Sequence, residues 1–230
     1  ITAKSASEIV GLQESLARLG FETPQIINMT EAVISGSIAM NAELAETAEL
    51  TGAVVKTFSN FSSIDAPDIL DKMTLATQKS ALNFGKLQTA LPIVGGAANA
   101  AGVSFEQTLA LLGKLSDAGI DASSSANALK RIFIESKKGG LDYGQILTKI
   151  SNESDKLTSS VDEFGVRAAV SSAILAEKLT ETADLTNKLS DATIFQGTAQ
   201  TAAAERLDTF TGSLTLFSSA YEGLLIKMNK

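Results

Sequence analysis

The stretch GVSFEQTLALLGKLSDAGID, residues 102–121, contains the start, the body and the end of one helix. Gly102 is a stop signal for a preceding helix. Ser104 and Gln107 have the spacing of a capping box, in which each side chain satisfies a backbone N–H group at the helix start. Gly119 ends the pattern. The apolar positions between these signals recur at helical spacing, and they are Leu109, Leu112 and Leu115. The stretch therefore predicts a short amphipathic helix between two tight turns.

Similar signals recur on both sides of this stretch. Ser5 and Glu8 form a second capping box, and the sequence Thr23-Pro24 is typical of a helix start. A basic C-terminal turn followed by glycines, Lys137 to Gly140, ends the helix that follows residue 121. Further helices are predicted at residues 43–59, 123–136, 143–150 and 161–192. Three others are predicted to start near Asp65, to contain Pro92 and to start near Thr198.

The composition agrees with a helical fold. Among 230 residues there are 33 alanines, and only 5% of the residues are aromatic. Alanine is the best helix former, whereas strands favour β-branched and aromatic residues. We predict an all-α fold, a multi-helix bundle of short packed helices followed by a long C-terminal helix with a heptad pattern.

The residues that are missing exclude several classes of chemistry. The chain has no His and no Cys, so it contains no Ser-His-Asp triad, no Cys-His dyad, no disulfide and no thiolate zinc site. Asp117 and Asp121 flank a glycine, but a calcium loop needs more oxygen ligands at fixed spacing. We interpret them as a helix end and a cap. No catalytic residue, metal ligand or cofactor is expected.

The net charge of −7 argues against binding to nucleic acid. A surface that binds phosphate needs clustered Lys and Arg, and the basic pairs here are Lys130-Arg131 and Lys137-Lys138. Residues 87–105 form 19 residues without a charge, which raises the possibility of a membrane span, but several are polar or Gly. A membrane-active or pore-forming helical domain therefore remains the alternative function.

The last helix carries the sharpest periodicity. Its apolar residues alternate between spacings of three and four, which is the heptad pattern of a coiled-coil seam. From Ala203 onward, the seam consists of Leu207, Phe210, Leu214, Phe217, Tyr221, Leu224 and Met228. The flanking positions carry few charges, so the pattern fits self-association and packing on the parent chain equally well.

The predicted domain organisation places a helical module at residues 1–150 and a polar linker at 151–160. Residues 161–230 form a helical segment that leads into the extended helix. Because the chain begins at Ile1 rather than Met and ends within a helical pattern, we expect it to be an excerpt of a longer polypeptide.

The stretch from Ala98 to Phe133 resembles the core of the phage tail tape measure family, a helical region near the start of a long ruler protein. The resemblance rests on the order and spacing of small and apolar residues, with Ser125-Ala126-Asn127 where the family often has Ala-Gly-Thr. The motif positions are Gly102, Ser104, Glu106, Thr108, Gly113, Gly119, Ile120, Leu129 and Arg131. Asp71-Lys72-Met73 lies upstream in the expected order.

The resemblance implies a structural virion protein of a phage or prophage, with no catalytic site and no cofactor. Such proteins control tail length and assembly, lie in the tail lumen and leave ahead of the DNA. They are made in the cytoplasm of the bacterial host, and their partners are tail tube, tail tip and tail assembly chaperone proteins. The resemblance implies no specific nucleic acid partner and no membrane contact for this fragment.

Overall fold

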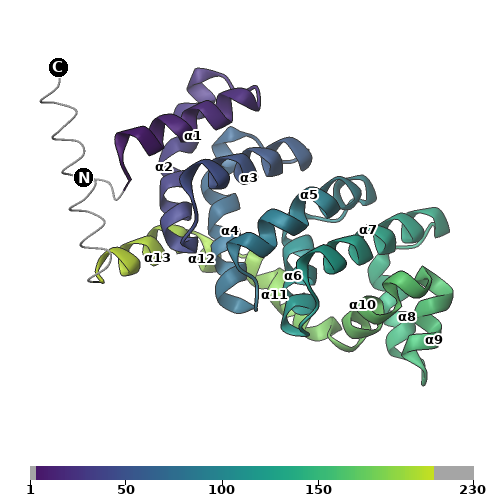
Figure 1. Cartoon of the computed structure of the whole chain (residues 1–230). Helices are drawn as coiled ribbons and strands as arrows, with labels where there is room; N and C mark the ends of the chain where they lie inside the picture. The colour runs from purple at the N-terminus through teal and green to yellow at the C-terminus, as the bar shows by residue number, and fades with distance from the viewer. Residues whose placement is uncertain (1–3, 210–230) are drawn as a thin grey trace, which may run out of the picture. The chain divides into compact units, whose positions relative to one another are not determined.

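The computed structural model describes residues 4–209, and these residues contain helices and connecting turns with no strand (Figure 1). The all-α prediction is therefore confirmed. Most helices begin and end at the capping signals of the sequence. The Ser5 hydroxyl accepts a hydrogen bond from the backbone N–H of Glu8, and the Glu8 carboxylate accepts one from the N–H of Ser5.

The helices are short, and the longest have 18 residues. In chain order they are α1 (Ala6–Arg18), α2 (Thr23–Met40), α3 (Leu44–Thr57), a 3-10 turn η1 (Ser63–Asp65), α4 (Ala66–Lys79), α5 (Phe84–Ala101) and α6 (Phe105–Asp117). They continue with α7 (Ala122–Gly139), α8 (Tyr143–Ser151), α9 (Lys156–Phe164), α10 (Val166–Glu177), α11 (Leu179–Ser190), α12 (Ala192–Phe195) and α13 (Thr198–Leu207).

The chain forms two compact units. Unit 1 contains the described residues up to Leu75 together with those from Phe195 onward, and unit 2 is Ala76–Ile194. The two ends of the described chain thus share one unit. The stretch 151–160, where the sequence predicts a linker, holds the last residue of α8 and the first half of α9, and the predicted division there stays a prediction.

Unit 1 is built around α2 and α3. Helix α1 packs on both of them, and α13 packs on α2. The side chains of Leu16, Met29 and Val33 are fully buried between these helices. A second buried cluster joins α13 to α2 and contains Ala39, Ala199, Ala202 and Ala203. Because burial of apolar surface is the main favourable contribution to folding, these contacts hold α13 and the N-terminal helices in one unit.

Unit 2 is built around the packing of α5 on α7, with α9 on α10 and α6 on α11. Its core holds large side chains that are no more than 1% exposed, and these are Leu87, Phe105, Leu129, Phe133 and Phe164. The ring of Phe133 meets that of Tyr143 edge to face, with 5.5 Å between the ring centroids. Burial of Tyr143 raises the pKa of its phenol to about 12.

The structure does not show the long C-terminal helix that the heptad pattern predicts from Thr198 onward. Helix α13 ends at Leu207, after ten residues. The hydroxyl of Thr209 donates a hydrogen bond to the carbonyl oxygen of Arg206 at 2.7 Å. The rest of the seam, from Phe210 to Met228, lies outside the described residues.

Candidate functional site

The turn between α5 and α6 is built by the first residues of the motif. Gly102 ends α5 in the left-handed region, with φ +78°, which glycine adopts without a steric penalty. The Ser104 hydroxyl then accepts a hydrogen bond from the N–H of Gln107 at 3.1 Å, and the Gln107 side chain accepts one from the N–H of Ser104 at 2.9 Å. The predicted capping box is present.

The next two motif residues, Glu106 and Thr108, lie in the first turns of α6. Thr108 is fully buried, and its hydroxyl donates to the carbonyl oxygen of Ser104 at 2.8 Å. Glu106 lies in the first turn of α6, where a negative charge interacts favourably with the helix dipole. These residues stabilise the start of a buried helix and converge on no common point.

Gly113 allows other helices to approach α6 closely. A Cβ atom built on Gly113 would lie 3.0 Å from the Oγ of Ser80 and 3.3 Å from a methyl carbon of Leu185. This glycine is therefore a packing residue of unit 2.

We expect Gly113→Val to destabilise unit 2 by about 1–3 kcal/mol, because the added methyl groups overfill a packed contact. The measurement is urea unfolding followed by circular dichroism. Gly96→Val is the matched control, since Gly96 also lies inside a helix but has no atom within 4 Å of its built Cβ. Equal losses for the two variants would show that Gly113 is not a close contact.

The turn between α6 and α7 confirms the interpretation of the two aspartates. Gly119 has φ +80°, and the N–H of Ile120 bonds back to the carbonyl oxygen of Leu115 at 3.0 Å. Asp121 caps α7 by accepting from the N–H of Ser124 at 2.9 Å. The hydrogen bonds from Ser124 lower the pKa of the Asp121 carboxyl.

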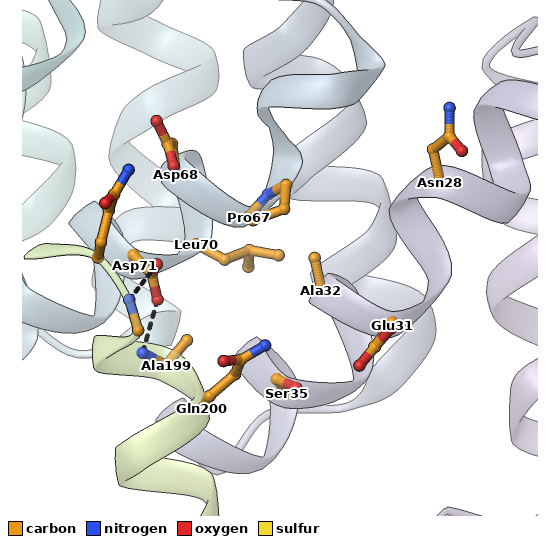
Figure 2. A pocket seen from close by; sticks show the side chains of 12 residues that line it. Asn28, Glu31, Ala32, Ser35, Pro67, Asp68, Leu70, Asp71, Ala199 and Gln200 are labelled. Carbon is orange, nitrogen blue, oxygen red and sulfur yellow. Dashed lines mark hydrogen bonds between the residues drawn. The ribbon is translucent and has the colours of Figure 1, made fainter. Parts of the chain in front are cut away.

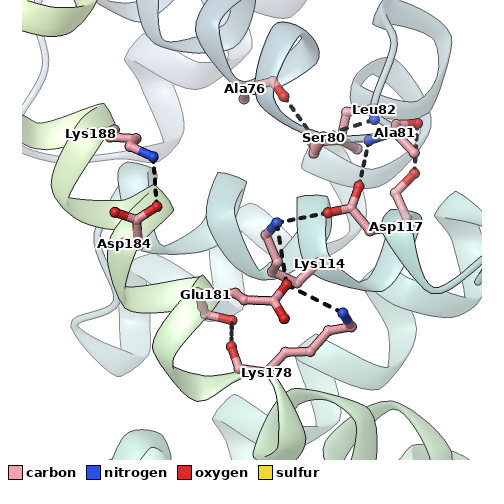
Figure 3. Close-up of polar contacts among 12 residues, drawn as sticks. Ala76, Ser80, Ala81, Leu82, Lys114, Asp117, Lys178, Glu181, Asp184 and Lys188 are labelled. Carbon is pink, nitrogen blue, oxygen red and sulfur yellow. Dashed lines mark hydrogen bonds and ion pairs between the residues drawn. The ribbon is translucent and has the colours of Figure 1, made fainter.

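Asp117 belongs to a polar cluster that joins the turn after α4 to α6 and α11 within unit 2 (Figure 3). Its carboxylate accepts from the N–H of Ala81 at 2.6 Å and pairs with Lys114 at 2.8 Å. Lys114 is only 9% exposed, and its Nζ also lies 3.9 Å from the carboxylate of Glu181. The spacing of Lys114 and Asp117 on one helix predicts their ion pair. No sequence signal indicates that Ala81 bonds to Asp117 or that Glu181 lies near Lys114.

The last motif residues, on α7, are also structural. Leu129 is fully buried, and the Nε of Arg131 donates a hydrogen bond to the carbonyl oxygen of Phe164 at the end of α9. The guanidinium group of Arg131 covers Gly165, between α9 and α10. Arg131 thus positions the connection between two helices. The nine motif residues form caps, turns and packing contacts of unit 2, and they do not gather in one pocket.

A different pair of residues joins distant parts of unit 1. The buried carboxylate of Asp71, on α4, accepts hydrogen bonds from the N–H groups of Gly197 at 2.8 Å and Ala199 at 2.7 Å (Figure 2). It thereby caps the start of α13 from a position more than 120 residues earlier in the chain. Burial raises the pKa of Asp71, although the two N–H donors act in the opposite direction.

The neighbouring Lys72 strengthens the same connection. Its Nζ lies 4.6 Å from the centroid of the Phe195 ring and 5.5 Å from that of Phe61. A cation over an aromatic face is attracted by the ring quadrupole. We call Asp71 and Lys72 the α4 clamp, because they hold residues 195–199 on α4.

A pocket of about 340 Å³ lies beside the α4 clamp and is lined by α2, α4 and the start of α13 (Figure 2). Its acidic side chains are Glu31, Asp68 and Asp71. The Asp71 carboxylate is already occupied by two backbone donors. Within residues 4–209, no group of three or more acidic side chains is arranged to hold a metal ion.

Most of the uncharged stretch 87–105, considered as a possible membrane span, lies in α5, which contains Pro92. Among the helices of the described chain, none combines the length and the apolarity that a bilayer crossing requires.

The chain is similar to phage tail proteins. The profile of the phage-related minor tail protein family matches residues 1–207. The probable tape measure protein of Escherichia phage P2 is 26% identical over 168 residues, which cover 73% of this chain and 19% of that protein. The tape measure protein of Pneumococcus phage Dp-1 is 24% identical over 165 residues, covering 72% of this chain and 13% of that protein. The chain thus spans less than a fifth of the length of these relatives. No solved structure matches it.

Proposed function

Because the chain belongs to the phage-related minor tail protein family, we propose that it is a segment of a tape measure protein that controls tail length and assembly. The observation that carries the proposal is the match to two tape measure proteins over more than 70% of this chain. Both relatives are far longer than the segment, as a ruler that converts residue number into length must be.

The role of this segment is structural rather than enzymatic. The motif residues Ser104, Gly113 and Arg131 support this role, since they cap a helix, admit a close packing contact and bond to a backbone carbonyl. Residues of this kind maintain a fold. They provide neither a nucleophile with its base nor an acid–base pair around a cavity.

The segment acts as a pair of folded units within the ruler rather than as a stretch of extended rod. An extended helix rises about 1.5 Å per residue, so helices of at most 18 residues each span about 27 Å or less. Successive helices pack on one another within each unit, so their lengths do not add along one axis.

The proposed location is the lumen of the tail tube, after synthesis in the cytoplasm of the bacterial host. The proposed partners are the tail tube, tail tip and tail assembly chaperone proteins. The net charge of −7 would limit adhesion to DNA that passes through the same tube. Self-association through the seam stays a prediction, since most of the seam lies outside the described residues.

The alternative, a membrane-active domain, has less support. No helix among residues 4–209 is suited to cross a membrane, and both relatives are tape measure proteins.

The proposal is tested on purified virions with an antibody raised against residues 4–209. We expect the antibody to detect the segment on immunoblots of intact virions and to detect much less of it in tails that have ejected their DNA. A tail tube protein serves as the control that stays in both samples. Equal amounts of the segment before and after ejection would contradict a location in the lumen, and its absence from intact virions would contradict a tail protein.

A further inference from the structure

A pocket of about 650 Å³ with an excess of positive charge lies on unit 2, and we call it the basic pocket. One face of α7 provides most of its lining, and α10 contributes Arg167. Its charged side chains are the cations of Lys130, Arg131 and Arg167 and the single carboxylate of Glu135. Unit 2 as a whole has 12 Lys and Arg residues against 13 Asp and Glu residues. The pocket is therefore positive in a unit that carries no positive charge overall.

The fold does not neutralise these cations. The Glu135 carboxylate pairs at 3.2 Å with the Nζ of Lys138, which does not line the pocket. Lys130 and Arg167 are exposed, and no carboxylate among residues 4–209 lies within ion-pair distance of either. Both side chains are therefore available to an anionic group from outside the chain.

Arg131 adds a cation that is already held in position. Its Nε bonds to the carbonyl oxygen of Phe164, and its guanidinium group covers Gly165 at the start of α10. Arg167, two residues after that glycine, lines the same pocket. A guanidinium group donates two parallel hydrogen bonds to a carboxylate, and one that is already ordered loses less entropy on binding. The arrangement thus suits carboxylate groups.

Apolar side chains at the pocket favour an acidic protein segment over a nucleic acid. Ile134 lines the pocket and is 40% exposed, and Val170, one turn after Arg167 on α10, is 54% exposed. A protein segment can cover such residues with an apolar side chain of its own. Binding to a nucleic acid backbone depends instead on many phosphate contacts, and this pocket offers three cations in a chain of net charge −7.

The length of the basic pocket sets the size of the segment. Its lining residues on α7 run from Ser124 to Glu135, which corresponds to about 16 Å of helix. An extended segment of about five residues spans this distance. Such a segment is long enough to bring two or three carboxylates and one apolar side chain into the pocket.

We propose that the basic pocket binds an acidic segment of a partner protein. Its carboxylates pair with Lys130, Arg131 and Arg167, and its apolar side chain covers Ile134. The inference rests on the charge and the lining of unit 2 alone, so it does not depend on the tail function. Binding of a nucleic acid at the same cations is the competing result.

The test measures binding of a dye-labelled polyglutamate peptide with one central leucine to the 230-residue chain, by fluorescence anisotropy at low ionic strength. We expect Lys130→Ala/Arg167→Ala to weaken binding at least about fivefold, because two ion pairs are lost. Arg131 is left in place, since it also bonds to the backbone. The control Lys79→Ala/Lys156→Ala removes two cations of unit 2 that do not line the pocket and should change binding less than about twofold.

The central leucine separates docking in the pocket from general attraction between charges. Replacing it by serine should weaken binding to the unaltered chain about threefold or more, because less apolar surface is buried. In Ile134→Ala the two peptides should bind with similar affinity, since their difference depends on the contact with Ile134. Circular dichroism checks that each variant is folded.

Three results would overturn the proposal. The first is the absence of measurable binding of the leucine peptide to the unaltered chain. The second is an equal loss of affinity in the pocket variant and in the lysine control. The third is tighter binding of a single-stranded DNA with the same number of negative charges, lost in the pocket variant, which would assign the pocket to a nucleic acid.

Discussion

Replacing Phe133 by alanine is expected to destabilise unit 2 by about 3–5 kcal/mol, because it removes a fully buried aromatic ring and leaves a cavity. Phe133 lies on α7, the helix that packs on α5, and its ring also contacts Tyr143 of α8. Since small domains are stable by about 5–15 kcal/mol, a loss of this size removes a large part of the stability of unit 2.

The measurement is chemical denaturation followed by circular dichroism, with hydrogen exchange to assign the loss to unit 2. Ile134→Ala is the control, because Ile134 is the next residue on the same helix but is 40% exposed. We expect the control to cost less than about 1 kcal/mol. A similar small cost for Phe133→Ala would show that α7 does not pack as described.

The second large effect is expected for Asp71→Ala, in the α4 clamp. This change removes the carboxylate that accepts from Gly197 and Ala199 and leaves both N–H groups without that acceptor. Hydrogen bonds to a charged group contribute about 1.5–3 kcal/mol each, and the two bonds share one carboxylate. We therefore expect unit 1 to lose about 2–4 kcal/mol.

A specific signature distinguishes this mechanism from general damage. The amide hydrogens of Gly197 and Ala199 should exchange much faster in Asp71→Ala, while those in the middle of α1 stay protected. Asp71→Asn should lose less stability, because the amide oxygen still accepts one of the two hydrogen bonds. Asp68→Ala is the control, since Asp68 lies one turn earlier on α4 and its charge raises the pKa of Asp71. Unchanged exchange at Ala199 would contradict the clamp.

What the sequence predicts well is local. Ser104 with Gln107, and Gly119 with Asp121, act within a few residues, so the helix starts and turns can be recognised from their spacing. The α4 clamp could not be predicted, because Asp71 meets its partners across more than 120 residues and its only local signal is a charge on a helix. The burial of Lys114 could not be predicted either, because its partner Glu181 lies on a helix far along the chain.

The departure from the predicted long C-terminal helix is seen at the end of α13. The heptad pattern beyond Thr198 reflects the spacing of apolar residues and does not indicate where a helix ends. In the structure α13 ends at Leu207, and the Thr209 hydroxyl donates a hydrogen bond to the carbonyl oxygen of Arg206. The polar stretch 151–160 contains the start of α9, because Asp155 caps that helix by accepting from the N–H of Thr158 at 3.0 Å. Polar residues at this position begin a helix as readily as they form a linker.

The central claim is that this segment is a folded part of a tape measure protein. The most direct test is to delete residues 76–194 from the parent protein and to measure the length of the tails that assemble. The deletion removes the 119 residues of unit 2, for which a compact fold has a diameter of about 35 Å. As an extended helix, the same residues would span about 180 Å. We expect tails that are shorter by a few tens of ångströms in averaged electron micrographs. A shortening near 180 Å would contradict the folded unit, and an unchanged length would contradict a role in length control.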